Sequence, residues 1–137
     1  MAETLELEIV TPNRRVLAER VAEVILPSED DYLGVRPGHA PLLARLDVGE
    51  VSYRKDGEEC FLALSGGFAE VLRTGVSILA KGCEPADEID LARAEKSKER
   101  AEKRVKAQIS DTNFDRAELS LKRAINRIGI AGRRRVR

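Results

Sequence analysis

The chain contains one histidine, His39, within the stretch GVRPGHAPLL at residues 34–43. An imidazole can serve as a general base or bind a metal ion. A metal site needs several ligands, however, and no cluster of cysteine or histidine accompanies this residue. A catalytic histidine needs a nucleophile or an orienting acid, and no recognisable motif presents one. We therefore expect neither catalysis nor metal binding here, and interpret the stretch as a rigid turn that places Leu42 and Leu43 in a core.

The other groups with reactive chemistry are also sparse. Cys60 and Cys83 are far apart in sequence, which favours two reduced, buried thiols. No phosphate-binding loop of the form GxxxxGK[ST] is present, and the pair Gly66-Gly67 lies among apolar strand residues. We expect this pair to permit close packing of the backbone. The sequence thus predicts a protein with no catalytic residues, no metal and no required cofactor.

Charge divides the chain into two parts. The 24 basic and 24 acidic residues balance overall. Residues 1–86, however, carry nine basic and 15 acidic residues, whereas residues 87–137 carry 15 and nine. This asymmetry indicates two parts with different partners. No apolar run approaches the ~20 residues that span a bilayer, and the N-terminus lacks the pattern of a signal peptide. We therefore expect any membrane contact to be made through a partner.

The first part reads as short strands. Leu5, Leu7 and Ile9 alternate with glutamates, which is the period of a half-buried strand. Asp56-Gly57 predicts the turn of a hairpin, and residues 73–75 predict another. Many short strands without a long helical segment favour a β-sandwich or barrel over residues 1–86.

From Asp87 onward the composition is typical of helices, with abundant Ala, Glu, Lys and Arg and no proline. We predict helices at 87–109 and 114–128, ended by Gly129 and joined as an antiparallel hairpin over 87–137. The fold class is therefore α+β, an N-terminal all-β sandwich followed by two helices. Their apolar seams are narrow and rich in alanine, so the hairpin is marginal alone and able to detach. The seam residues of the second helix are Ala117, Leu121, Ala124 and Ile128.

Four segments in the same order resemble one family. LGVRPGHAPLL is similar to the LGILPGHxPL signature of the epsilon subunit of F-type ATP synthases, and LALSGGFAEVL to its SGGFxEV segment. EIDLARA and FDRAELSLKRAINR resemble its C-terminal helical hairpin. The resemblance runs from about Leu5 to Ile128.

The resemblance implies a non-catalytic subunit of the rotor's central stalk, on the cytoplasmic face of the bacterial inner membrane, where the enzyme couples proton translocation to ATP synthesis. It implies contacts with the gamma subunit and the ring of c subunits. The hairpin, when extended toward the alpha and beta subunits, would hinder ATP hydrolysis. His39 then belongs to a scaffold and docking stretch. Candidates for c-ring contact are the acids before the first signature, Glu29, Asp30 and Asp31. Candidates for the inhibitory contact are Arg116, Lys122, Arg123 and Arg127.

The same resemblance implies that ATP binds as a regulatory ligand. EIDLARA matches the I(L)DxxRA motif of epsilon subunits that bind ATP, and it falls on Ile89, Asp90, Arg93 and Ala94, with Glu84 just ahead. Asp90 would accept from the adenine amino group, and arginines would bind the phosphates. The candidate phosphate ligands are Arg100, Arg116, Arg123 and Arg127.

An alternative from another functional class is a nucleic-acid-binding adaptor that uses the basic hairpin and the GRRRVR tail. Aromatic content of 4%, the absence of a known nucleic-acid motif and the acids mixed into the first helix all weigh against it.

Overall fold

The computed structural model describes residues 3–107 and 111–131, with the backbone only for 111–113. Residues 108–110, where the first predicted helix ends and the link begins, and the tail at 132–137 lie outside the described residues. The elements are β1 (Leu5–Val10), β2 (Arg15–Val21), β3 (Glu23–Pro27), β4 (Tyr32–Val35), β5 (Leu42–Lys55), β6 (Glu58–Val71), β7 (Gly75–Ala80), β8 (Cys83–Pro85), the 3₁₀ turn η1 (Ala86–Glu88), α1 (Leu91–Ala107) and α2 (Asp111–Ala131).

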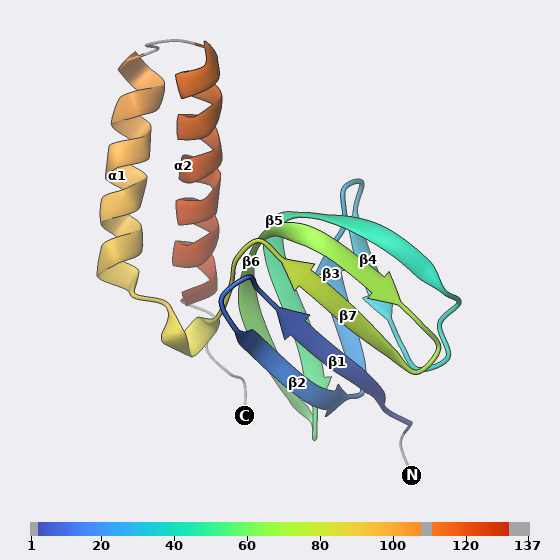
Figure 1. Cartoon of the computed structure of the whole chain (residues 1–137). Helices are drawn as coiled ribbons and strands as arrows, with labels where there is room; N and C mark the ends of the chain where they lie inside the picture. The colour runs from blue at the N-terminus through green and yellow to red at the C-terminus, as the bar shows by residue number, and fades with distance from the viewer. Residues whose placement is uncertain (1–2, 108–110, 132–137) are drawn as a thin grey trace.

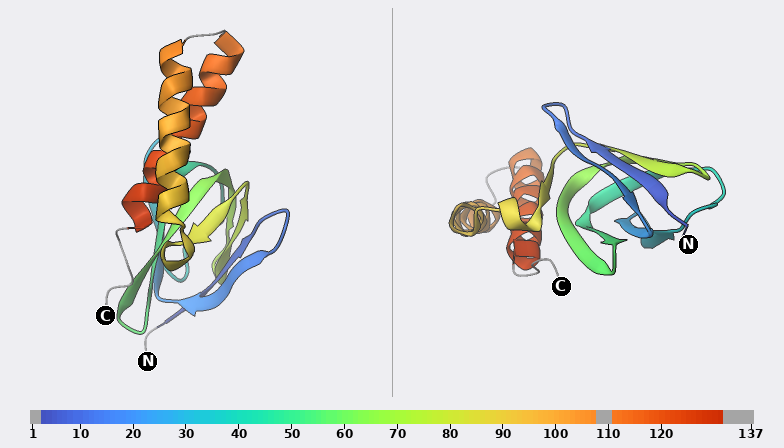
Figure 2. Two further views of the ribbon diagram at one scale, coloured as in Figure 1. Left: turned by 90° about the vertical axis from the view of Figure 1, so that its left-hand side faces the viewer. Right: turned by 90° about the horizontal axis from the view of Figure 1, so that it is seen from below.

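The strands form one sheet that folds over into two layers (Figure 1, Figure 2). Its order is β2-β1-β7-β6-β5-β3-β4, with β8 also paired to β6. The long strands β5 and β6, 14 residues each, run through both layers. Residues 67–71 of β6 pair with β7, whereas residues 62–64 pair with β8. The predicted sandwich is confirmed, and a continuous backbone ladder joins its two layers.

The Gly66-Gly67 pair lies where β6 bends between the layers. Gly66 has a φ of 99° and Gly67 a φ of 150°, conformations that L side chains rarely adopt. A Cβ on Gly67 would lie 2.2 Å from the carbonyl oxygen of Leu79. The expectation of close backbone packing is therefore confirmed. Opposite the pair, β5 bends at Asp47, which the regular pairing register of β5 with β6 skips.

The core lies between the two layers, and the alternation read from the sequence places it correctly. Leu5, Leu7 and Ile9 are buried, as the period predicts. The hairpin turn at Asp56-Gly57 is also confirmed: both residues have positive φ, at 52° and 80°, which suits a two-residue turn between β5 and β6.

The expectation that Leu42 and Leu43 enter a core is wrong. Both side chains are exposed, Leu43 by 78%. Alternation along β5 directs Leu43 to the outer face of the sheet, beside its ladder partner Glu70. Leu42 lies on the opposite face at the first position of β5, where it remains 41% exposed. Val71, the partner of Leu42 in the ladder, is fully buried on the same face, so the core ends at this pair.

The helices differ from their predicted bounds at both ends. α1 begins at Leu91 rather than Asp87, because the chain first makes η1 and then caps α1 with Asp90, whose Oδ1 accepts from the Arg93 N–H at 3.0 Å. α2 continues through Gly129 to Ala131. A helical glycine costs about 1 kcal/mol, and the burial of Ile130 against the sandwich offsets it.

The two helices pack through alanines, as the narrow seams predict. Ala94 and Ala101 of α1 and Ala117 and Ala124 of α2 are buried. α2 contacts β5, β6 and η1, while α1 lies on its far side, away from the sheet (Figure 2). The hairpin is thus folded down onto the sandwich through α2.

Candidate functional site

A pocket of about 360 Å³ lies at the foot of the hairpin, where the end of β8, η1 and the two helices meet. Six of the nine residues predicted to bind ATP line it. The lining consists of Glu84, Glu88, Ile89, Asp90, Arg93, Ala94, Ser97 and Arg127. The fold therefore brings Arg127 of α2 to a motif more than 30 residues earlier in the chain.

Asp90 has a structural role that the motif alone did not reveal. One carboxylate oxygen, Oδ1, caps α1 through the Arg93 N–H. That bond leaves the second oxygen, Oδ2, available as an acceptor on a residue that lines the pocket. The Arg93 side chain is exposed, and its guanidinium makes no ion pair within residues 3–107 and 111–131.

Arg127 enters the pocket already paired. Its Nε lies 2.8 Å from Glu84 Oε1, with both side chains about one third exposed. Because Glu84 belongs to β8 and Arg127 to α2, this pair links the hairpin to the sandwich at the rim of the pocket. An incoming phosphate would have to share or replace this carboxylate.

Three of the predicted phosphate ligands, Arg100, Arg116 and Arg123, do not line the pocket. Arg100 donates to Ser97 Oγ at 3.2 Å, so it lies on the same helix as a lining residue but one turn further on. Arg123 lies one turn before Arg127 on α2, and its buried Nε has no hydrogen-bond partner among the described residues. A buried donor without a partner is costly, so an acceptor that reached Arg123 Nε would be stabilising.

Two lining residues, Glu88 and Ser97, were not among the predicted ligands. Glu88 is held by Arg14 from the β1–β2 loop at 3.0 Å. Ser97 lies four residues after Arg93, so helical spacing alone places the two on one face. The helical spacing could therefore have identified Ser97 as a lining residue. The contact of Glu88 with Arg14 spans 74 residues, so no local sequence pattern could have identified Glu88.

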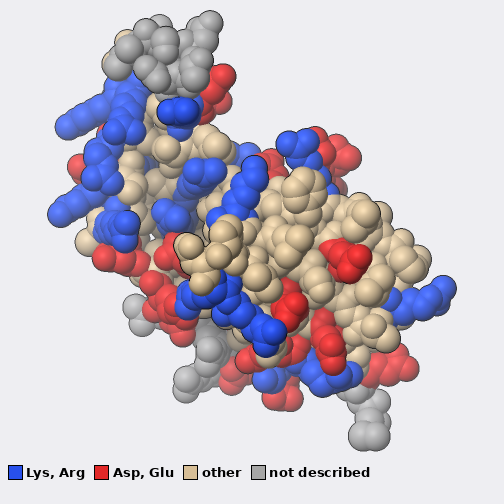
Figure 3. Space-filling view, viewed as in Figure 1, with Lys and Arg blue, Asp and Glu red and all other residues tan. Residues whose placement is uncertain are grey.

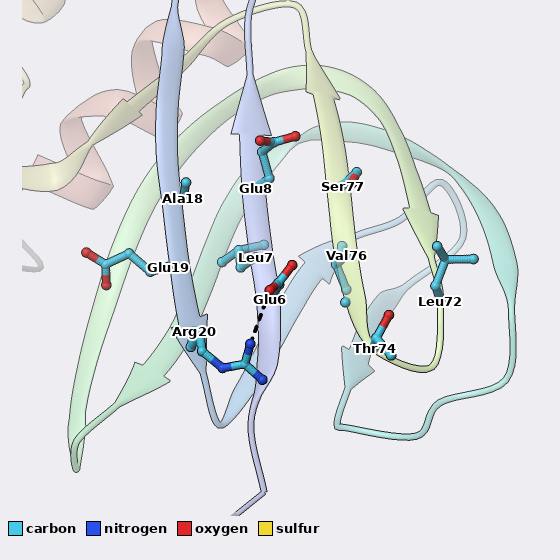
Figure 4. A pocket seen from close by; sticks show the side chains of 11 residues that line it. Glu6, Leu7, Glu8, Ala18, Glu19, Arg20, Leu72, Thr74, Val76 and Ser77 are labelled. Atoms are coloured by element: carbon cyan, nitrogen blue, oxygen red, sulfur yellow. Dashed lines mark hydrogen bonds and ion pairs between the residues drawn. The ribbon is translucent and has the colours of Figure 1, made fainter.

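A second, wider hollow of about 430 Å³ lies on the outer face of β1, β2 and β7 (Figure 4). Its carboxylates have cationic partners: Glu6 Oε1 lies 3.1 Å from Arg20, and Glu8 Oε2 lies 3.3 Å from Arg15. Leu72 and Thr74 form one rim, as Figure 4 shows. The hollow is open and ion-paired, which suits a contact surface better than a small-molecule site.

Exposed apolar side chains continue this outer face across β5, β6 and β7. Phe68 pairs with Leu79 in the ladder, and Leu43 pairs with Glu70. Phe68 is 58% and Leu79 63% exposed, and Leu72 is also exposed. Figure 3 shows a broad uncharged area over this side of the sandwich. An apolar area of this kind marks a protein interaction surface.

The acidic residues 29–31 form the exposed turn between β3 and β4. Ser28 N donates to Asp31 O at 2.9 Å, and Tyr32 N donates to Asp31 Oδ1 at 2.7 Å. Glu29, Asp30 and Asp31 are all exposed, and none forms an ion pair within the described part of the chain. The turn therefore presents three uncompensated carboxylates on a fixed backbone.

The turn around His39 carries no constellation of reactive groups. The ring Nδ1 donates to the carbonyl oxygen of Ala40 at 2.7 Å. Over the described ranges, no group of three or more His, Cys, Asp or Glu side chains is placed to hold a metal ion. Likewise, neither helix, as far as it is described, has the length and apolar character needed to cross a membrane.

A sandwich with an apolar outer face, joined to a basic helical hairpin, defines a small protein built for docking. Two family models match the chain. The model described as ATP synthase, Delta/Epsilon chain, beta-sandwich domain covers residues 4–86, and that described as the long alpha-helix domain of the same chain covers residues 87–132. The chain therefore belongs to the ATP synthase delta/epsilon chain family, which confirms the resemblance and the expectation of a non-catalytic subunit.

Named relatives narrow the assignment to epsilon chains. The ATP synthase epsilon chain of Syntrophobacter fumaroxidans is 44% identical over 131 residues, 96% of this chain and 98% of its own length. That of Koribacter versatilis is 50% identical over 105 residues, 77% of this chain and 74% of its own length. A chain in a structure of Euglena gracilis mitochondrial ATP synthase matches with a TM-score of 0.76 at 24% identity, over 87% of this chain and 76% of that chain. At that identity the structural match supports the fold alone.

Proposed function

We propose that this chain is the epsilon subunit in the central stalk of a bacterial F-type ATP synthase, and that its hairpin both binds ATP and inhibits ATP hydrolysis. The observation that carries the nucleotide part is the pocket at the foot of the hairpin. It gathers Glu84, the Ile89–Ala94 motif and Arg127 around one space of about 360 Å³.

The chemistry of the pocket suits a nucleotide. Ala94 is small and buried, which leaves room for a flat base against α1. Asp90 retains a free carboxylate oxygen for an amino group while it caps the helix. Arg93 and Arg127 supply positive charge in the pocket, and an arginine fork matches phosphate oxygens. Binding without hydrolysis needs only this charge and shape.

Calorimetry of the isolated chain tests this proposal. Arg93→Ala removes an exposed cation that is not paired within the described residues, so the fold should persist while ATP binding weakens by roughly 10- to 100-fold, the range for a charged hydrogen bond. Arg104→Ala is the matched control, because Arg104 is an exposed arginine of α1 that does not line the pocket. No saturable binding at millimolar ATP, with a folded hairpin, would refute ATP binding.

The sandwich supplies the docking part of the proposal. The gamma subunit would cover the apolar outer face of β5, β6 and β7, where Leu43, Phe68 and Leu79 are exposed. The c-ring would meet the acidic turn at Glu29, Asp30 and Asp31. These contacts would hold the chain at the cytoplasmic face of the inner membrane through the complex. A Phe68→Glu variant should lose binding to gamma while retaining cooperative unfolding, and retained binding would contradict this placement.

We expect the hairpin to be dispensable for the fold of the sandwich. The main core cluster contains only residues of β1 to β8, so we expect a 1–86 fragment to unfold cooperatively and to bind gamma. In the assembled complex, truncation after Asp87 should raise ATP hydrolysis without loss of assembly. Unchanged hydrolysis would remove the hairpin from regulation.

A further inference from the structure

Three side chains of α2, Lys122, Asn126 and Arg127, make polar contacts that hold the hairpin down. Lys122 Nζ lies 3.1 Å from Asp47 Oδ2 and 3.2 Å from Oδ1. Asn126 Nδ2 donates to Gly49 O at 2.9 Å, a carbonyl of β5. Arg127 pairs with Glu84. All three contacts link α2 to the sandwich rather than to α1.

Asp47 lies at the bend of β5, and a hydrogen bond from the next residue orients its side chain. Its Oδ1 accepts from the Val48 N–H at 2.8 Å, which orients the carboxylate at the corner of the sandwich. The carboxylate and the Lys122 ammonium are each about half exposed. The pair is therefore specific in geometry but open to competition from other charges.

The held cations belong to the inhibitory set. Of the four candidates for the inhibitory contact, Lys122 and Arg127 are paired with sandwich carboxylates in this folded-down state. Arg116 and Arg123 have no such partner within the described residues. While Lys122 and Arg127 are held against the sandwich, they cannot reach a surface that only the opened hairpin would meet.

We propose that Asp47 is an internal competitor for the inhibitory contact. It holds Lys122 in the folded-down hairpin, and the hairpin must release this ion pair before Lys122 can meet an acidic partner. Asp47 therefore opposes inhibition from outside the hairpin and outside the nucleotide pocket. The pair Glu84–Arg127 also holds the hairpin down, but it lies in the nucleotide pocket, so a change there would alter ATP binding as well. A change at Asp47 alters only the contact that holds the hairpin. This inference rests on the proposed inhibitory function.

Charge reversal in the isolated chain tests the pair. Energy transfer between dyes on Cys60 and on a Lys106→Cys cysteine at the far end of α1 reports the hairpin position. Asp47→Lys and Lys122→Asp should each shift the ratio of folded-down to open hairpin about two- to five-fold toward open, the range for exposed ion pairs. The double variant should restore the ratio. Glu3→Gln, which changes an exposed carboxylate of the sandwich far from α2, should leave it unchanged.

The assembled complex tests the competition. Asp47→Asn leaves every hairpin residue intact, so deeper inhibition of ATP hydrolysis by this variant supports the proposal. Energy transfer unchanged by the single reversals, or a double variant as open as the two singles combined, would overturn it. Open hairpins without any change in hydrolysis would instead refute the proposed inhibitory function, while the ion pair would stand as a contact that holds the hairpin.

Discussion

Ile130→Ala should release the hairpin without unfolding the sandwich. Ile130 is 3% exposed and packs with Ala63 and Ala86 in a small cluster separate from the main core. Truncation of a buried isoleucine costs about 2–5 kcal/mol. Ile130 packs in a small cluster with alanines at the base of the hairpin, so we expect a cost at the low end, about 2 kcal/mol. The ratio of folded-down to detached hairpin should fall about 30-fold.

Amide exchange along α2 measures this ratio, because a detached helix with so little apolar area frays and exchanges. Ile125→Ala is the matched control: it makes the same substitution on the same helix, with the same gain in helix propensity, at a side chain that is 50% exposed. Exchange in β5 and β6 should not change in either variant. Equal exchange of α2 in both variants would show that Ile130 does not hold the hairpin.

Three further predictions follow from single residues. Burial raises the pKa of the Cys83 thiol to about 12, so at pH 8 about one thiol in ten thousand is ionised; an alkylating reagent should modify the half-exposed Cys60 and reach Cys83 only on unfolding. Gly67→Ala should destabilise the sandwich by more than about 2 kcal/mol in denaturant titration, whereas Gly34→Ala, where a Cβ meets nothing within 4 Å, should not. The Val48 N–H and the Lys122 ammonium lower the pKa of Asp47 below its ordinary 3.8. The stabilisation of the folded-down hairpin by Asp47 is therefore present above that value and is lost as the pH falls through the lowered pKa. Hairpin opening should rise below about pH 4, and Asp47→Asn should abolish that part of the pH dependence.

Local chemistry was readable from the sequence. The turn at Asp56-Gly57 follows from the positive φ that this pair tolerates, and the inward residues of β1 follow from their alternation. The alanine seam between the helices follows from helical spacing. In each case, neighbours in sequence determine the structure.

Contacts between distant segments were not readable. The pair Asp47–Lys122 spans 75 residues and that of Asn126 with Gly49 spans 77, so no local pattern announces either. Leu43 is an apolar residue of a type usually found in cores, yet the alternation of side chains along β5 places it on the exposed face of the sheet. The motif around Asp90 could be recognised, but its meeting with Arg127 depends on how the hairpin folds back.

The continuous ladder of the sandwich has a mechanical consequence. Because β5 and β6 belong to both layers, the layers cannot slide past each other without breaking backbone hydrogen bonds. A force applied at the β3–β4 edge is carried to the β1–β2 edge by the backbone as well as by side-chain contacts. A body of this kind resists shear between its layers, and a torque applied to one face is transmitted to the other with little elastic lag.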